Sequence, residues 1–212
     1  MRVYHFLGAK YGLGAVRKRR LKASLLNELN DPFELLGIDL SDEGLRRAME
    51  RTKDQLSASK ALHCFSMEWT NPVLWSHYAD KHRGICLGFD VPDELLLKVR
   101  YVSERLPSNA LTEGTVQDRE DFMKQLLGTK FAHWKYESEV RIFVKKDTDT
   151  GLHFTDFSDN LTLKEIIVGM QATTTEIDID QALGEDAGEV EVFAVRAAFK
   201  SFDVVRLKDR RA

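Results

Sequence analysis

One stretch decides the fold: Cys64-Phe-Ser-Met-Glu-Trp-Thr-Asn-Pro-Val-Leu-Trp-Ser-His-Tyr-Ala-Asp-Lys-His-Arg-Gly-Ile-Cys-Leu-Gly-Phe-Asp90. Apolar runs at 61–65 and 85–89 have the length and the flanking residues of buried strands. Between them, Pro72 near the first position of a helix and Gly84 after its end mark a short helical segment. The stretch therefore predicts a strand, a short helix and a second strand, with Trp75, His77 and Tyr78 on the helix.

Strand-like runs dominate the rest of the chain. Residues 3–7 indicate a first strand, and 8–14 a glycine-rich loop that lacks the spacing of a phosphate-binding fingerprint. Residues 21–29 fit a strand or a helix, and periodicity does not decide between them. Helices are expected at 41–57, 116–127 and 174–183, strands at 99–102, 137–145, 152–154, 165–168, 190–197 and 202–207, and a frayed charged tail at 203–212.

This order of elements is typical of an α+β protein. We expect one domain spanning residues 1–212, because the chain contains no linker, no internal repeat and no low-complexity segment. Its core should be a mostly antiparallel, split β-sheet flanked by helices.

The composition limits the function. A formal net charge of -3 argues against a protein that coats nucleic acids non-specifically, but it does not exclude an enzyme that acts on a nucleic acid. The apolar runs are far shorter than the roughly 18 residues of a membrane span, and the N-terminus lacks the apolar core of a signal peptide. Both cysteines, Cys64 and Cys86, lie in apolar runs, which favours buried free thiols. We therefore expect a cytoplasmic protein without membrane contact.

Four polar residues on expected elements are candidates for chemistry: His5, Tyr78, Glu137 and Glu139. His5 comes at the end of the first strand, where a structural histidine is the ordinary alternative. Tyr78 lies on the short helix, where its hydroxyl would otherwise only complete a core hydrogen bond. Glu137 and Glu139 share an expected strand face with Arg141, which indicates either a surface ion-pair ladder or a buried, ionised Glu139 able to stabilise a developing cation.

Six motifs occur along the chain: Tyr4-His5, Asn30-Asp-Pro-Phe-Glu34, Cys64-Phe-Ser66, Leu74-Trp-Ser-His-Tyr-Ala-Asp80, Gly84-Ile-Cys-Leu-Gly-Phe89 and Trp134-Lys-Tyr-Glu-Ser-Glu-Val-Arg141. Together they resemble a bacterial family catalogued as domain of unknown function 2971. The resemblance extends from residue 3 to about residue 170 and gives no activity.

More distantly, the layout resembles the ADP-ribosyltransferases of the His-Tyr-Glu type. That resemblance implies an ADP-ribosyltransferase-like fold with His5, Tyr78 and Glu139 as the catalytic set. It also implies that Phe65-Ser66 forms the aromatic–serine element of that family, and that Glu137 orients the acceptor.

The implied substrate is NAD, whose cleavage at the glycosidic bond builds positive charge on the ribose. The resemblance implies that Glu139 stabilises that charge, that His5 donates a hydrogen bond to a ribose hydroxyl, and that Tyr78 holds the nicotinamide ring by stacking. Arg83, or the basic run 17–20, would pair with the pyrophosphate. The expected sets are His5, Ser66, Tyr78 and Arg83 for the cofactor and Glu137, Arg141 and Trp75 for the substrate, with no metal.

Other functions remain open on the sequence. The acceptor is undetermined among protein, nucleic acid, small molecule and water. A non-catalytic nucleotide-binding or protein-interaction module, in a defence or toxin-related system, is the main alternative. Hydrolase or nuclease chemistry has less support, because the histidines lack metal-ligand spacing and thiolates are disfavoured in apolar runs; its residues would be His77, Asp80, His82 and Glu139, or Cys64 or Cys86 with His63 or His77.

Overall fold

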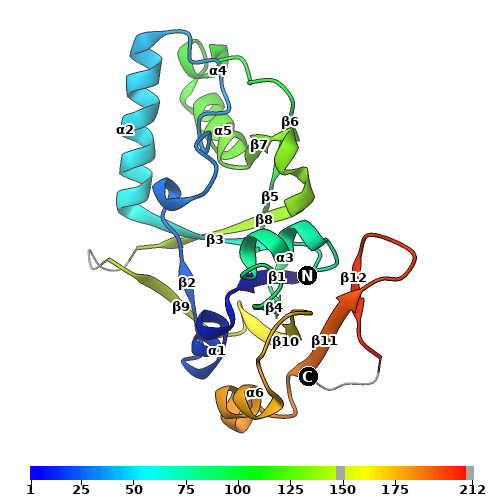
Figure 1. The fold of residues 1–212 in the computed structure, drawn as a ribbon. Coiled ribbons are helices and arrows are strands. Elements are labelled where there is room, and N and C mark those ends of the chain that lie inside the picture. The colour runs from blue at the N-terminus through cyan, green and yellow to red at the C-terminus, as the bar shows by residue number, and fades with distance from the viewer. Residues whose placement is uncertain (147–150, 209–212) are drawn as a thin grey trace.

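The computed structural model describes residues 1–146 and 151–208, and it has an α+β architecture with a mainly antiparallel sheet (Figure 1). The prediction of a mostly antiparallel sheet flanked by helices is confirmed. Eight strands form the main sheet, in the order β12 (Val204–Arg206), β11 (Glu191–Ala197), β10 (Thr162–Val168), β4 (Ile85–Asp90), β1 (Arg2–Leu7), β3 (Lys60–Ser66), β8 (Glu139–Lys145) and β5 (Leu97–Lys98).

The pairing between neighbouring strands is uneven. β1 runs antiparallel to β4 along its whole length, and β3 does the same with β8, whereas β10 and β11 are parallel. β1 and β3 share only the pair Tyr4–Ser66. The main sheet thus consists of a five-stranded block that ends at β1 and a three-stranded block that begins at β3, joined at one residue pair.

The remaining elements surround this sheet. The helices are α1 (Ala9–Arg17), α2 (Glu43–Ser59), α3 (Pro72–Tyr78), α4 (Asn109–Thr112), α5 (Val116–Leu127) and α6 (Glu176–Leu183), and the 3-10 turns are η1 (Leu26–Glu28), η2 (Asp93–Leu95), η3 (Ala132–Glu137) and η4 (Gly184–Asp186). α2, α4 and α5 gather beside the three-stranded block, while α1 and α6 pack together beside the other block (Figure 1). Two smaller sheets pair β2 (Arg20–Ala23) with β9 (His153–Asp156) and β6 (Arg100–Val102) with β7 (Thr129–Phe131).

The decisive stretch has the predicted structure, β3 followed by α3 and β4. Pro72 is the first residue of α3, and the Asn71 side chain accepts a hydrogen bond from the Val73 amide at 2.9 Å. This cap satisfies an amide at the helix start that no helical carbonyl can reach. Among the described residues, no helix combines the length and the apolar character needed to cross a bilayer.

The glycine-rich loop prediction is wrong, because residues 9–17 form α1. A Cβ atom at Gly12 would lie 2.5 Å from Cδ1 of Ile85, so the glycine allows the helix to pack closely on β4. The ambiguous segment 21–29 belongs partly to β2 and partly to η1.

Two predicted ends also differ. Glu137 ends η3 instead of lying in a strand, and β8 begins at Glu139 after Ser138 takes a left-handed conformation with φ 45°. β12 confirms the strand expected at 202–207, so the expectation of a frayed tail from residue 203 onward is wrong for this part, while residues 209–212 lie outside the described part of the chain.

Candidate functional site

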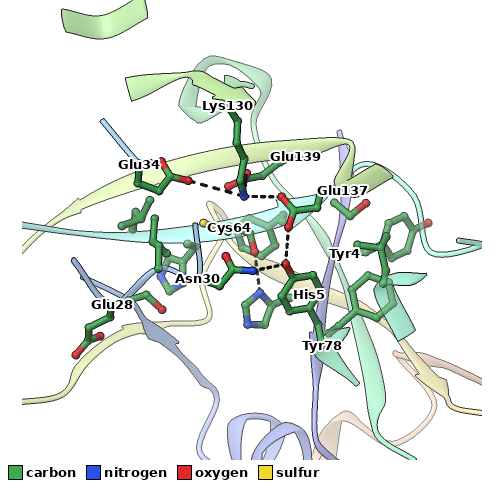
Figure 2. A pocket seen from close by; sticks show the side chains of 18 of the residues that line it. Tyr4, His5, Glu28, Asn30, Glu34, Cys64, Tyr78, Lys130, Glu137 and Glu139 are labelled. Atoms are coloured by element: carbon green, nitrogen blue, oxygen red, sulfur yellow. Dashed lines mark hydrogen bonds and ion pairs between the residues drawn. The ribbon is translucent and has the colours of Figure 1, made fainter. Parts of the chain in front are cut away.

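A cavity of about 270 Å³ lies where the two blocks of the sheet meet. Its walls come from β1, β3, the segment 24–34, α3, β7, η3 and β8 (Figure 2). Among the residues that line it are His5, Ser66, Tyr78, Glu137 and Glu139. Five candidate residues from distant parts of the sequence therefore lie around one cavity.

The single-pair joint explains the position of this cavity. His5 directly follows Tyr4, the last residue of β1 that pairs with β3. Beyond that pair the ladder is replaced by a side-chain contact, in which His5 Nδ1 donates to the Cys64 carbonyl at 2.9 Å. This bond fixes the tautomer, and burial lowers the pKa of His5, so the ring is neutral and its Nε2 carries a lone pair. The expectation that His5 donates to a ligand hydroxyl is therefore wrong, because its free nitrogen can only accept.

Buried charges form one wall of the cavity. Arg141, which has no exposed surface, holds two carboxylates with a fork geometry. Its Nη1 and Nη2 donate to Glu34 at 2.8 and 2.6 Å, and its Nε and Nη2 donate to Glu139 at 2.7 and 3.0 Å. Both oxygens of Glu139 are thereby engaged before any ligand arrives.

Lys130 brings the second glutamate into this wall. Its ammonium group lies 2.6 Å from Glu137, 3.2 Å from Glu139 and 3.8 Å from Glu34, and 4.8 Å from the ring centre of Trp134. Three carboxylates and the two cations Lys130 and Arg141 thus share a buried network. Figure 2 shows the Lys130 side of this network, with Glu34, Glu137 and Glu139.

The two glutamates at the cavity have pKa values displaced in opposite directions. Burial by itself would raise the pKa of Glu139, but Arg141 and Lys130, with a hydrogen bond from Cys64, together outweigh it and hold this pKa below its usual range. Burial raises the pKa of Glu137, against the opposing effect of Lys130. One carboxylate is thereby kept ionised while the other more readily takes up a proton, an arrangement typical of acid–base pairs.

Tyr78 connects this charged wall to the open part of the cavity. Its hydroxyl donates to Oε1 of Glu137 and accepts from Asn30 Nδ2 at 2.7 Å. Burial and then the Glu137 carboxylate raise the pKa of Tyr78, so the phenol stays protonated and acts as a donor.

Three residues of this site escape prediction from the sequence: Asn30, Glu34 and Lys130. The sequence indicates Asn30 and Glu34 only as members of a turn and of a resemblance motif. Lys130 lies on a strand of three residues, and nothing in its sequence neighbourhood indicates that its ammonium group is buried.

Other predicted residues lie away from the cavity lining. Trp75 has no exposed surface and donates from Nε1 to the Trp69 carbonyl at 2.6 Å, so it belongs to the core instead of contacting a substrate. Arg83 is exposed and pairs with Asp80 at 3.0 Å. Arg141 lies behind Glu139 and acts on it without lining the cavity. In the basic run 17–20, the Arg20 guanidinium stacks on Phe154 at 4.0 Å.

The competing chemistries gain little from the structure. Within residues 1–146 and 151–208, no group of histidine, cysteine and acidic side chains is arranged to hold a metal ion. Burial raises the pKa of the Cys64 and Cys86 thiols, which opposes formation of a nucleophilic thiolate. The exposed His77 ring contacts the Tyr136 hydroxyl at 3.1 Å.

Comparison with known families gives one match. Residues 74–142 match the model of a family described as Protein of unknown function (DUF2971). This segment extends from α3 to β8 and contains Tyr78, Lys130, Glu137 and Glu139 of the cavity. No curated protein and no solved structure matches the chain.

Proposed function

We propose that this protein cleaves the bond between nicotinamide and ribose in NAD and passes ADP-ribose to an acceptor or to water. The observation that carries the proposal is the gathering of His5, Tyr78 and Glu139 around one cavity, although they are far apart in the sequence. The same cavity is lined by Ser66 and Glu137, which the resemblance to ADP-ribosyltransferases also implicates.

The chemistry assigns a distinct task to each group. Glu139, kept ionised by Arg141, supplies a fixed negative charge near the ribose, where positive charge develops as the bond breaks. Glu137 exchanges a proton with the acceptor, and Tyr78 supports the nicotinamide ring. The neutral His5 ring offers its Nε2 lone pair to a ribose hydroxyl.

The cavity size favours binding of one end of the dinucleotide. Sites for drug-sized ligands commonly occupy about 300–1,000 Å³. A volume of about 270 Å³ suits the nicotinamide and ribose, with the adenylate end outside.

A non-catalytic nucleotide-binding module is the second candidate. It is favoured by the saturation of Glu139, whose oxygens already receive hydrogen bonds from Arg141 and Lys130. Such a module would use the same cavity without turnover.

The deciding experiment compares the wild type, Glu139→Gln and Glu34→Gln in nicotinamide release from NAD and in thermal unfolding with and without NAD. Removing one charge from a buried pair can cost roughly 3–5 kcal/mol, so a stability control is needed. Glu34→Gln provides it, because Glu34 and Glu139 each make two hydrogen bonds to Arg141.

We expect Glu139→Gln to lose at least about a hundredfold in turnover, in the range of losses seen when one electrostatic group of an active site is removed. Glu34→Gln should lose much less turnover per folded molecule. Equal losses in both variants would make Glu139 a structural partner of Arg141. Stabilisation of the wild type by NAD without nicotinamide release would support the binding module. If NAD neither stabilises the wild type nor is cleaved by it, both candidate functions are contradicted.

A further inference from the structure

Lys130 is placed as a link between the two glutamates of the cavity. Its side chain is 4 % exposed, and its Nζ atom contacts Oε2 of Glu137 at 2.6 Å and Oε2 of Glu139 at 3.2 Å. These carboxylates come from different elements, η3 and β8, while Lys130 comes from β7. One ammonium group therefore connects three segments at the cavity wall (Figure 2).

In each carboxylate, the oxygen atom that does not contact Lys130 is held by another side chain. Oε1 of Glu137 accepts from Tyr78, and Oε1 of Glu139 accepts from Arg141. The Oε2 atoms of both glutamates accept hydrogen bonds from the same cation, Lys130. Oε2 of Glu139 also accepts a hydrogen bond from Nη2 of Arg141. Without a cation between them, two buried carboxylates this close would repel, and one would move or take up a proton.

The backbone between the glutamates makes this cation more important. Glu137 ends a 3-10 turn, and the left-handed Ser138 separates it from the strand that begins at Glu139. Regular strand alternation therefore does not hold the two side chains parallel. Their common orientation depends on what they both contact, and Lys130 contacts both.

We propose that Lys130 is the positioning residue of this site, which holds the carboxylates of Glu137 and Glu139 side by side at the cavity. The use of that arrangement in NAD cleavage rests on the proposed function, whereas the contacts themselves do not. The charged groups around the Lys130 ammonium are the carboxylates of Glu34, Glu137 and Glu139 and, beyond them, Arg141. Tyr78 and Tyr101 also reach these glutamates through their hydroxyl groups, on Glu137 Oε1 and on the Glu139 amide.

Three variants separate positioning from simple charge balance. Lys130→Met removes the charge but keeps a long apolar side chain. Lys130→Arg keeps the charge in a planar fork that does not reproduce the compact ammonium. Lys130→Met combined with Glu34→Gln removes one cation and one anion, so the net charge of the buried network is unchanged, and Glu34 has no proposed role in the reaction.

Two readouts are measured on each purified full-length variant. The first is the ionisation of Glu137 and Glu139, followed against pH by carbon NMR of labelled glutamate carboxyl groups. The second is the pH profile of nicotinamide release, with kcat and KM determined separately and with thermal unfolding as the folding control.

In Lys130→Met we expect the pKa of Glu137 to be higher by about one unit or more, because a neighbouring cation lowers a carboxyl pKa by roughly that amount. The acid limb of the activity profile should move in the same direction, and kcat should fall at least about tenfold with little change in KM, in line with the usual contribution of positioned acid–base groups. Lys130→Arg should recover the titration and part of kcat. The charge-balanced double variant should recover stability but not kcat.

An unchanged titration of Glu137 in Lys130→Met would overturn the proposal, as would full recovery of kcat in the double variant. If the wild type releases no nicotinamide, the proposed function fails, and the NMR titration alone then decides whether Lys130 positions the glutamates.

Discussion

At the scale of single residues, the site is defined by hydrogen bonds that join an aromatic side chain to buried charge. Tyr78 lies between Asn30, which donates to its hydroxyl at 2.7 Å, and Glu137, which accepts from it. The phenol therefore influences the carboxylate as well as the shape of the cavity. Its contribution can be separated from that of the ring by removing the oxygen alone.

Tyr78→Phe should raise the pKa of Glu137, because the hydrogen bond from the phenol favours the ionised carboxylate. It should also lower the free energy of unfolding by about 0.5–1.5 kcal/mol, the usual net value of one hydrogen bond. Urea unfolding and the carbon NMR titration of Glu137 measure both effects. A lower pKa for Glu137 in this variant would contradict the assigned direction of the bond.

At the scale of elements, the packing of α1 on β4 depends on a residue without a side chain. Gly12 faces Ile85, which is fully buried, and a Cβ atom would come within 2.5 Å of both Cδ1 and Cγ1 of Ile85. Gly14 lies in the same helix, and a Cβ atom added there would meet no atom within 4 Å. The two glycines therefore separate helix propensity from packing.

Gly12→Ala should destabilise the protein by about 1–3 kcal/mol, the usual cost of overpacking a core. Gly14→Ala should stabilise it by up to about 1 kcal/mol, because alanine is the better helix former. Chemical denaturation of both variants tests whether the free energy of unfolding changes in opposite directions. Stabilisation by Gly12→Ala would mean that Ile85 can move aside without cost.

The helices and strands differ in how well they can be predicted from the sequence. The segment β3, α3 and β4 was predictable, because local apolar runs, a proline start and a glycine end define it. α1 was missed because its glycines indicate a loop locally, whereas Gly12 serves helix packing here. The pairing of Glu34 with Arg141 at 2.6 Å joins distant segments, and no local pattern encodes it. Five residues of the cavity could thus be named individually, but not Asn30, Glu34 and Lys130 or the buried network behind them.

At the scale of the whole molecule, a buried histidine ties the small sheet of β2 and β9 to the main sheet. His63 lies on β3 with 1 % exposure, and its Nε2 is 2.7 Å from the Thr155 hydroxyl on β9. Burial, with a smaller effect of His5, lowers the pKa of His63 to about 3. The folded protein therefore favours the neutral ring, whereas the unfolded chain takes up a proton at higher pH.

This histidine should make the protein less stable as the pH falls. Between the unfolded pKa of about 6.5 and the folded value of about 3, the unfolded state binds more protons, so acid favours unfolding. His63→Gln should flatten the decline in unfolding free energy between about pH 6 and pH 4, which lies inside this window. Urea unfolding across this range tests it, with His133→Gln, a change at an exposed histidine, as the control. Equal slopes in both variants would exclude His63 as the cause.

The joint between the two blocks of the sheet has a consequence for how the chain reaches its native state. The chain enters the five-stranded block with β1, moves to the other block for β3, returns for β4, crosses again for β5 and β8, and comes back for β10. Neither block is a continuous piece of sequence, so neither can be expressed alone or fold first as a unit. Contacts between such distant segments also slow folding. The cavity therefore forms only when strands of both blocks, β1 from one and β3 and β8 from the other, have come together.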